Sequence, residues 1–213
     1  MGLNTVNFHF LWRLLYNNSA RMYDLLSFLV SHGHWKAWCR TSLSFLEHRR
    51  ILEMAHGPGY LLIALREAGF HPVGIDLSAR MTSRAKRRLS KARMDVPLVR
   101  CRAQELPFRT GSFDEVVATF PTDYIFDPRT ICEAARVSSE RGRLVVVAGA
   151  QPRGVQPDSH FVAWLRHMTE RGAGRKERGP SLFAEAGLTT RIEHKRVANG
   201  IVTLFIAEKT GRS

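Results

Sequence analysis

Residues 51–60 read Ile51-Leu52-Glu53-Met54-Ala55-His56-Gly57-Pro58-Gly59-Tyr60, a short apolar run followed by two glycines around a proline. The apolar run is typical of a buried strand over 51–55, and Gly-Pro-Gly predicts a turn over 57–59. Residues 60–68 then have helical spacing and are followed by Gly69, a common helix stop. Glycines let a ligand approach the backbone, and the N-terminus of the following helix attracts an anionic group. The stretch therefore predicts a ligand-binding turn.

A second strand, predicted over 72–76, supplies an acid at the expected distance from this turn. Asp76 lies 19 positions after Gly57 (76 − 57), and an acid about 20 residues on binds ribose hydroxyls in nucleotide-binding βαβ units. The dinucleotide fingerprint also needs a third glycine, where this chain has Leu62, and no phosphate-loop lysine follows the turn. The sequence therefore predicts a nucleotide site of another type.

Strands and helices alternate through most of the remaining chain. Further strands are predicted over 96–100, 113–120 and 143–148. Helices are predicted over 78–91 and from Pro128 onward, with Ser78 and Asp127 as their N-caps. This alternation predicts the α/β class, with a Rossmann-like, doubly wound and mostly parallel sheet. Runs over 188–197 and 201–207, joined at Asn199-Gly200, predict a C-terminal antiparallel hairpin. Helices over 161–168 and 181–186 and a linker over 171–179 are expected before it.

The N-terminal part differs in character. Apolar and aromatic residues recur at helical spacing through residues 4–47, with interruptions at Asn18-Ser19 and around Gly33. We expect residues 1–47 to be a helical extension that acts as a lid, and residues 48–213 to be the nucleotide-binding domain. The competing interpretation is that the N-terminal aromatic side chains pack permanently on the sheet.

The composition is that of a globular protein with surplus positive charge. Its 213 residues are 44% hydrophobic and 24% charged, which excludes disordered and fibrous classes. A formal net charge of +13 attracts nucleic acid, acidic lipid or an anionic substrate. The cysteines, Cys39, Cys101 and Cys132, are too widely spaced for a disulfide framework or a zinc knuckle, so we expect a cytoplasmic location and no metal site. No apolar run approaches the ~20 residues of a transmembrane helix.

Four motifs in order resemble those of class I S-adenosylmethionine-dependent methyltransferases. Residues 53–59 resemble the family's E/D-x-G-x-G-x-G motif, and residues 74–81 resemble its G-x-D-x-S-x-x-M motif. Residues 103–108 and 111–114 resemble its A-x-x-L-P-F and S-F-D segments. The resemblance covers residues 50–150 and is nearest to the quinone-biosynthesis and small-molecule subgroup. It implies a seven-stranded sheet whose last strand inserts antiparallel, and S-adenosylmethionine as the cofactor.

The resemblance also assigns cofactor-binding positions in this chain. They are Glu53, Ala55, Gly57 and Gly59 for the methionine part, Asp76 for the ribose, Leu77 and Met81 for the adenine faces, Ala103 and Gln104 for the adenine edge, and Thr119 and Phe120 for the methyl-donor site.

Two residues depart from the family pattern. Ala55 replaces the usual first glycine, which is harmless to the backbone if its φ is negative, although it adds a methyl group beside the cofactor. Arg102 replaces the aspartate that accepts the adenine amino proton in many members, and the side-chain carbonyl of Gln104 or the backbone could substitute for it. His56, inside the turn, either borders the methionine part or fills a tolerant position.

Asp123 and Tyr124 follow the fourth strand, at the edge where ligands bind in such sheets. Either residue could orient or deprotonate an acceptor, and capping the next helix is an equally ordinary role for Asp123. The resemblance implies direct methyl transfer to a small, lipophilic acceptor. The basic run over 80–93 leaves RNA methylation as an alternative. A basic membrane-surface or partner-binding protein with a vestigial nucleotide fold is a third interpretation, and the oligomeric state stays open.

Overall fold

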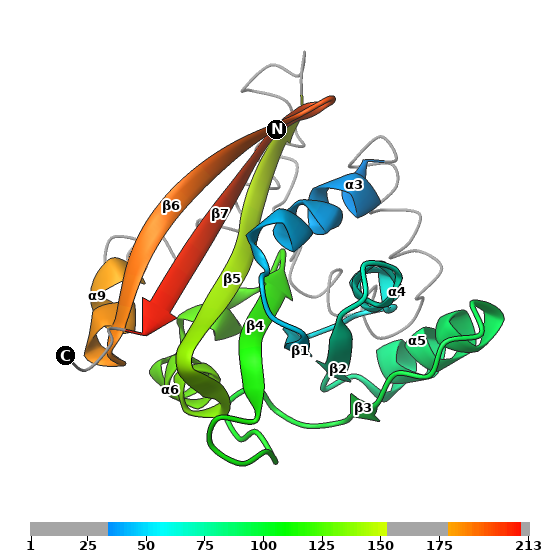
Figure 1. Ribbon diagram of the computed structural model, residues 1–213, viewed down its shortest axis with the longest axis horizontal. Helices are drawn as coiled ribbons and strands as arrows, with labels where there is room; N and C mark the ends of the chain where they lie inside the picture. The colour runs from blue at the N-terminus through cyan, green and yellow to red at the C-terminus, as the bar shows by residue number, and fades with distance from the viewer. Residues whose placement is uncertain (1–33, 153–178, 210–213) are drawn as a thin grey trace, which may run out of the picture. The chain divides into compact units, whose positions relative to one another are not determined.

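The computed structural model describes residues 34–152 and 179–209 of the chain. The chain divides into two compact units, Met1–Trp35 and Lys36–Ser213, and the described strands all lie in the second. These strands form one seven-stranded sheet with the order β3-β2-β1-β4-β5-β7-β6 (Figure 1). The sequence prediction of a seven-stranded, mostly parallel sheet is confirmed.

The parallel half of the sheet is doubly wound, as predicted. Strand β1 pairs with β2 on one side and with β4 on the other, and β2 pairs with the edge strand β3. The strands are β1 (Arg50–Met54), β2 (His71–Ile75), β3 (Leu98–Val99) and β4 (Phe113–Thr119), and the helices between and after them are α4 (Tyr60–Glu67), α5 (Ala79–Lys91) and α6 (Pro128–Val137). The predicted caps are present, because the side chains of Ser78 and Asp127 accept hydrogen bonds from backbone N–H groups in α5 and α6.

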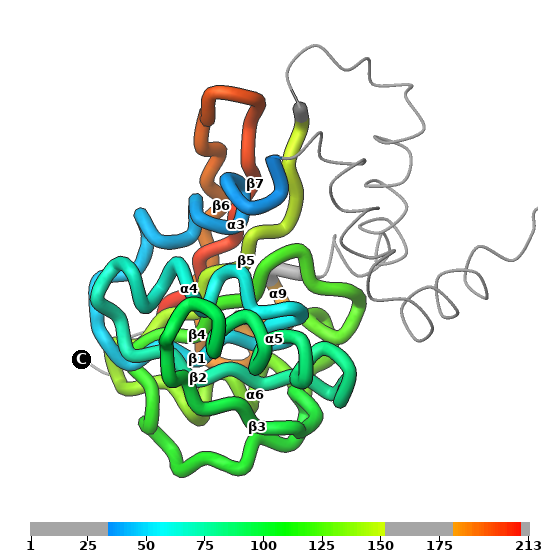
Figure 2. The backbone as a smooth tube through the Cα atoms, turned by 90° about the vertical axis from the view of Figure 1, so that its right-hand side faces the viewer, coloured from blue at the N-terminus to red at the C-terminus, as the bar shows by residue number. Residues whose placement is uncertain are grey.

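The antiparallel half contains the predicted hairpin. Strand β5 (Ser138–Pro152) pairs parallel with β4 and antiparallel with β7 (Gly200–Lys209), and β7 pairs with the edge strand β6 (Leu188–Val197). Pairing of β4 with β5 ends at Thr119, whereas pairing of β5 with β7 continues to Pro152. The three long strands therefore run on together beyond the parallel half, as Figures 1 and 2 show.

Buried side chains cover both faces of the sheet. Since successive residues of a strand point to opposite faces, Val117 faces one cluster and Val116 faces the other. The first cluster includes residues of α4, Trp38 of α3 (Trp35–Arg40) and Leu46, which follows the 3₁₀ helix η1 (Thr41–Phe45). The second cluster includes α6 and Phe183 of α9 (Gly179–Glu185). The residues directly before β1 thus belong to the core of the sheet.

Several predicted boundaries were wrong. Strand β5 starts at Ser138, directly after α6, because it already pairs with β4 there across an irregularity in register. Position 142 in this irregularity has no room for a side chain, because a Cβ on Gly142 would lie only 2.7 Å from the Ser138 Cβ. Strand β3 has only two residues, and the hairpin strand β7 begins at Gly200 itself. The predicted helix over 161–168 and the helices before residue 34 lie outside the described residues. So does the linker predicted over 171–179, except for Gly179, which begins α9.

Candidate functional site

The carboxyl ends of β1 and β2 bring the glycine turn and Asp76 together. One Asp76 oxygen, Oδ2, accepts the N–H of Gly57 at 2.9 Å, and the other, Oδ1, accepts the N–H of Ser78 at 2.7 Å. The N–H of His56 also donates to the Ile75 carbonyl at 3.0 Å. Asp76 therefore fastens the turn after β1 to the start of α5, which explains why an acid is needed at this position.

Glu53 is the second buried carboxyl group at this edge. Its exposed fraction is 2%, and that of Asp76 is 3%. Burial, together with the nearby Asp76, raises the pKa of Glu53 well above its ordinary value. Burial also raises the pKa of Asp76, against the lowering effect of its backbone donors and His56. Glu53 Oε2 has no hydrogen-bond partner within the described part of the chain. Buried polar atoms are nearly always paired, so this unpaired oxygen is an exception within the described residues.

His56 has a structural role in the turn. Its ring is 3% exposed, and Nδ1–H donates to the Gly57 carbonyl at 2.7 Å. Gly74 makes room for it, since a Cβ at Gly74 would lie 2.9 Å from the ring carbon Cδ2. Burial lowers the pKa of His56, although Asp76 acts in the opposite direction. The His56 ring is therefore part of the packing and hydrogen bonding of the turn itself.

The backbone of the turn uses left-handed conformations. The φ angles are +52° at Ala55, +52° at Gly57 and +79° at Gly59. The condition under which Ala55 would be harmless is thus not met. A Cβ on Gly59 would lie 2.9 Å from the Ala85 Cβ, whereas a Cβ on Gly57 would meet nothing within 4 Å. Gly57 therefore offers a backbone that a ligand can approach, and Gly59 permits close packing of α5.

The expected adenine positions lie around the ends of β2 and β3. Leu77 is 58% exposed, an unusual state for a large apolar side chain next to a buried strand, whereas Met81 is fully buried in α5. Ala103 and Gln104 are the central residues of a turn closed by a hydrogen bond from Glu105 N–H to the Arg102 carbonyl at 3.2 Å. Of the two residues expected at the adenine faces, the structure therefore exposes Leu77 and buries Met81.

The end of β4 is supported by residues that precede the sheet in the sequence. Burial raises the pKa of the Cys39 thiol to about 12, against the lowering effect of the Thr119 side chain. The Trp38 ring lies 6.4 Å from the Phe120 ring between centroids. Phe120 itself has φ of +46°, and its N–H donates to the Val147 carbonyl at 2.8 Å. Sequence reasoning missed the contributions of Trp38 and Cys39, for which no local pattern exists.

The two acid–base candidates lie in the short helix η2 (Asp123–Phe126). Asp123 is exposed and Tyr124 is half-buried against the core cluster that contains α6. Asp127, rather than Asp123, caps α6. Asp123 therefore does not have the capping role that was the alternative to a catalytic role.

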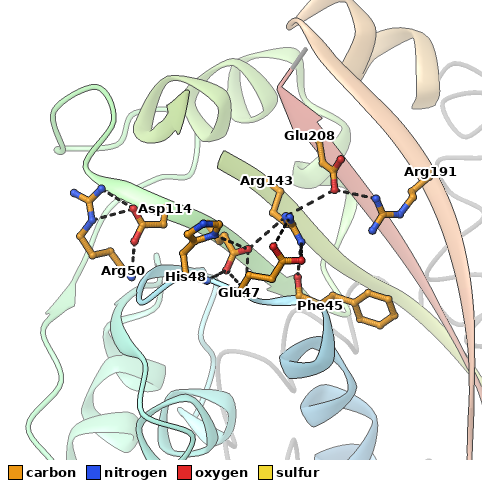
Figure 3. A network of polar contacts seen from close by, with 9 residues as sticks. Phe45, Glu47, His48, Arg50, Asp114, Arg143, Arg191 and Glu208 are labelled. Carbon is orange, nitrogen blue, oxygen red and sulfur yellow. Dashed lines mark hydrogen bonds and ion pairs between the residues drawn. The ribbon is translucent and has the colours of Figure 1, made fainter. Parts of the chain in front are cut away.

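A charged network occupies the opposite end of the strands (Figure 3). Glu115, with an exposed fraction of 0%, accepts N–H groups of Glu47 and His48 and lies 3.4 Å from Arg143 Nε. Burial raises the pKa of Glu115, which these donors partly offset. Because the network ties the start of β4 to β5 and to the chain before β1, its role is structural.

Residues 34–152 and 179–209 contain neither a cluster of metal ligands nor a membrane-spanning helix. No group of three His, Cys, Asp or Glu residues is placed to hold a metal ion there. No helix among them is long and apolar enough to cross a membrane.

Comparisons with known proteins agree with this geometry. The family model for a methyltransferase domain matches residues 51–142. The demethylmenaquinone methyltransferase of Mycolicibacterium vanbaalenii is 31% identical over 92% of this chain and 93% of its own length. That of Beutenbergia cavernae is 34% identical, over 65% of this chain and 58% of its own length.

A solved structure shares the fold. Geranyl diphosphate C-methyltransferase from Streptomyces coelicolor, in complex with Mg²⁺, geranyl diphosphate and S-adenosyl-L-homocysteine, aligns with a TM-score of 0.61 at 18% identity, over 82% of this chain and 79% of its own. Together with the glycine turn, the ribose acid and the sheet order, these matches settle the family. The chain belongs to the class I S-adenosylmethionine-dependent methyltransferases of the quinone-biosynthesis type.

Proposed function

We propose that this enzyme transfers a methyl group to a small, lipophilic acceptor of the demethylmenaquinone type, in the cytoplasm. The observation that carries the proposal is the near full-length match, at 31% identity, to a demethylmenaquinone methyltransferase. The six cations of α5 are the main support for the RNA alternative. They share the helix with the buried residues Met81, Ala85 and Leu89, which pack it on the sheet. A solvated outer face accounts for most of these cations, so no second function is proposed.

The residues at the carboxyl edge fit S-adenosylmethionine. Glu53 Oε2 is a buried acceptor without a partner in the described part of the chain, which suits the ammonium group of the methionine part. The open space at Gly57 lets the ligand lie against the backbone. Each Asp76 oxygen accepts one N–H group. A carboxylate oxygen has two acceptor sites, so both can still bind ribose hydroxyls. Glu53 and Asp76 are both buried, so the side chains that cover them must move before the cofactor can reach the two carboxyl groups.

When bound, S-adenosylmethionine supplies an electrophilic methyl group. The protein then has to orient the two reactants and exclude water. We assign the first task to Glu53 and Asp76, which hold the two ends of the cofactor's polar part. We assign the exclusion of water to Thr119, Phe120 and a lid. We propose that the part of the chain before Lys36 is this lid. The residues from Lys36 to Leu46 support the core, where Trp38 is 1% exposed.

On the acceptor side, we propose that Asp123 takes a proton from the acceptor and that Tyr124 orients it. Both residues follow β4 at the carboxyl edge, and Asp123 is exposed. A positioned base contributes roughly 10²–10⁴-fold to a rate. The Asp123→Asn variant should therefore lose at least tenfold in kcat, with unchanged affinity for S-adenosyl-L-homocysteine.

The direct test incubates the purified full-length protein with methyl-labelled S-adenosylmethionine and demethylmenaquinone in detergent micelles, with dithionite added to keep the acceptor in its hydroquinone form, whose ring carbon is nucleophilic and whose hydroxyl carries the proton that the base removes. We expect label in the organic extract, and a strong decrease with Asp123→Asn but not with Asp95→Asn, a matched change at an exposed site. Total RNA and anionic vesicles serve as competing acceptors in separate reactions. Label found only in RNA, or none in the quinone although the protein binds the cofactor product, would refute the proposed acceptor.

A further inference from the structure

The loop expected at the adenine edge is fastened to α6 at several points. Gln104 Nε2 donates to Asp127 Oδ2 at 3.1 Å, and the Leu106 N–H donates to Glu133 Oε2 at 2.7 Å. Arg136 donates to the carbonyls of Phe108 and Leu106 at 2.7 and 3.0 Å. Helix α6 therefore holds the whole loop in place. The Gln104–Asp127 contact lies at the end of the loop where the adenine edge is expected.

Asp127 is itself held firmly. Its Oδ1 accepts the N–H of Arg129 at 3.0 Å as the cap of α6, and its own N–H donates to the Tyr124 carbonyl at 3.1 Å. The remaining oxygen, Oδ2, faces Gln104. This oxygen accepts the hydrogen bond, so it receives the NH₂ end of the Gln104 amide. The reversed amide would place two acceptor oxygens 3.1 Å apart.

This contact decides which end of the Gln104 amide is available to a ligand. With Nε2 engaged, the carbonyl oxygen Oε1 is left, and no residue of the described ranges donates to it. We propose that Asp127 is a positioning residue. It fixes Gln104 with its carbonyl as the acceptor for the adenine amino group, in place of the aspartate that Arg102 replaces. The pair thereby selects adenine over a purine that carries oxygen at that position.

The inference rests on S-adenosylmethionine as cofactor and adds the residues that recognise its base. It predicts discrimination between S-adenosyl-L-homocysteine and S-inosyl-L-homocysteine, whose hypoxanthine has an oxygen where adenine has the amino group. That oxygen would face Gln104 Oε1, an acceptor against an acceptor. A site built to accept a hydrogen bond strongly disfavours an analogue that cannot donate one.

The test measures the dissociation constants of both compounds by isothermal titration with the full-length protein. We expect the wild type to bind the adenosyl compound at least tenfold more tightly. Asp127→Asn keeps the helix cap, for which asparagine is as good as aspartate, but places an NH₂ group beside Gln104. The Gln104 amide should then reverse, so the ratio of the two constants should fall at least fivefold, toward the inosyl compound.

Gln104→Ala should also lower this ratio at least threefold, while Asp95→Asn, an exposed control, should leave it unchanged. A merely structural role of Asp127 would weaken both compounds equally and leave the ratio constant. An unchanged ratio in both Asp127→Asn and Gln104→Ala, with tight binding of the adenosyl compound retained, would overturn the inference alone. Failure of the folded wild type to bind the adenosyl compound would overturn the cofactor assignment as well.

Discussion

Ala55 is one of three non-glycine residues in the described ranges that have a left-handed backbone conformation. Its φ of +52° lies in the left-handed region, where an L-residue with a Cβ is disfavoured by roughly 1–2 kcal/mol. Replacement by glycine removes this strain. The same change makes the unfolded chain more flexible, which costs about 0.4–1 kcal/mol, and it deletes a half-buried methyl group worth less than about 0.8 kcal/mol.

The balance of these terms is a small gain, so Ala55→Gly should stabilise the protein by about 0.5 kcal/mol. The matched control is Ala184→Gly in α9, an exposed helical position where the change should destabilise by about 0.5–1 kcal/mol. Urea unfolding of the ligand-free proteins measures both. A loss of stability at Ala55 equal to that at Ala184 would refute the claim that the turn strains this alanine.

Three other perturbations test the electrostatics and the organisation of the chain. The raised pKa of Glu53 means that the folded state keeps a proton that the unfolded state loses above pH 4.5. Wild type should therefore lose stability relative to Glu53→Gln by up to about 1.4 kcal/mol per pH unit as the pH rises toward that pKa; a pH-independent difference in urea unfolding would contradict this. Arg143→Gln should cost about 3 kcal/mol, because it removes a charged partner of the buried Glu115; a loss below about 1 kcal/mol would contradict that estimate. A chain that begins at Lys36 should fold and bind cofactor but lose methyl transfer, and an insoluble product would rule out the lid.

The topology was predictable because its signals are local. The apolar run, the glycine turn and Asp76 lie within 26 consecutive residues (51–76), and each predicts its own element. The hairpin follows from Asn199-Gly200 together with the β-rich runs on either side of it. The alternation of strands and helices then leaves few allowed connections, since parallel crossovers are right-handed.

Other features depend on contacts between distant parts of the chain. The early start of β5 at Ser138 results from pairing with Phe113, which no propensity near Gly142 indicates. The support of Phe120 by Trp38 requires the folded sheet. The orientation of Gln104 depends on Asp127, 23 positions away, although the capping role of Asp127 was visible in the sequence.

The most direct test of the cofactor site is calorimetric titration of the folded, full-length protein with S-adenosyl-L-homocysteine. We predict one binding site per chain. Asp76→Asn keeps an acceptor oxygen for the Gly57 N–H, but it loses the acceptor for the Ser78 N–H and the negative charge toward the ribose hydroxyls. It should weaken binding by about 1.5–3 kcal/mol, roughly 10- to 150-fold, while Asp95→Asn should bind as the wild type does. Absence of heat with folded wild-type protein, or an Asp76→Asn variant that binds as tightly as wild type, would contradict the account.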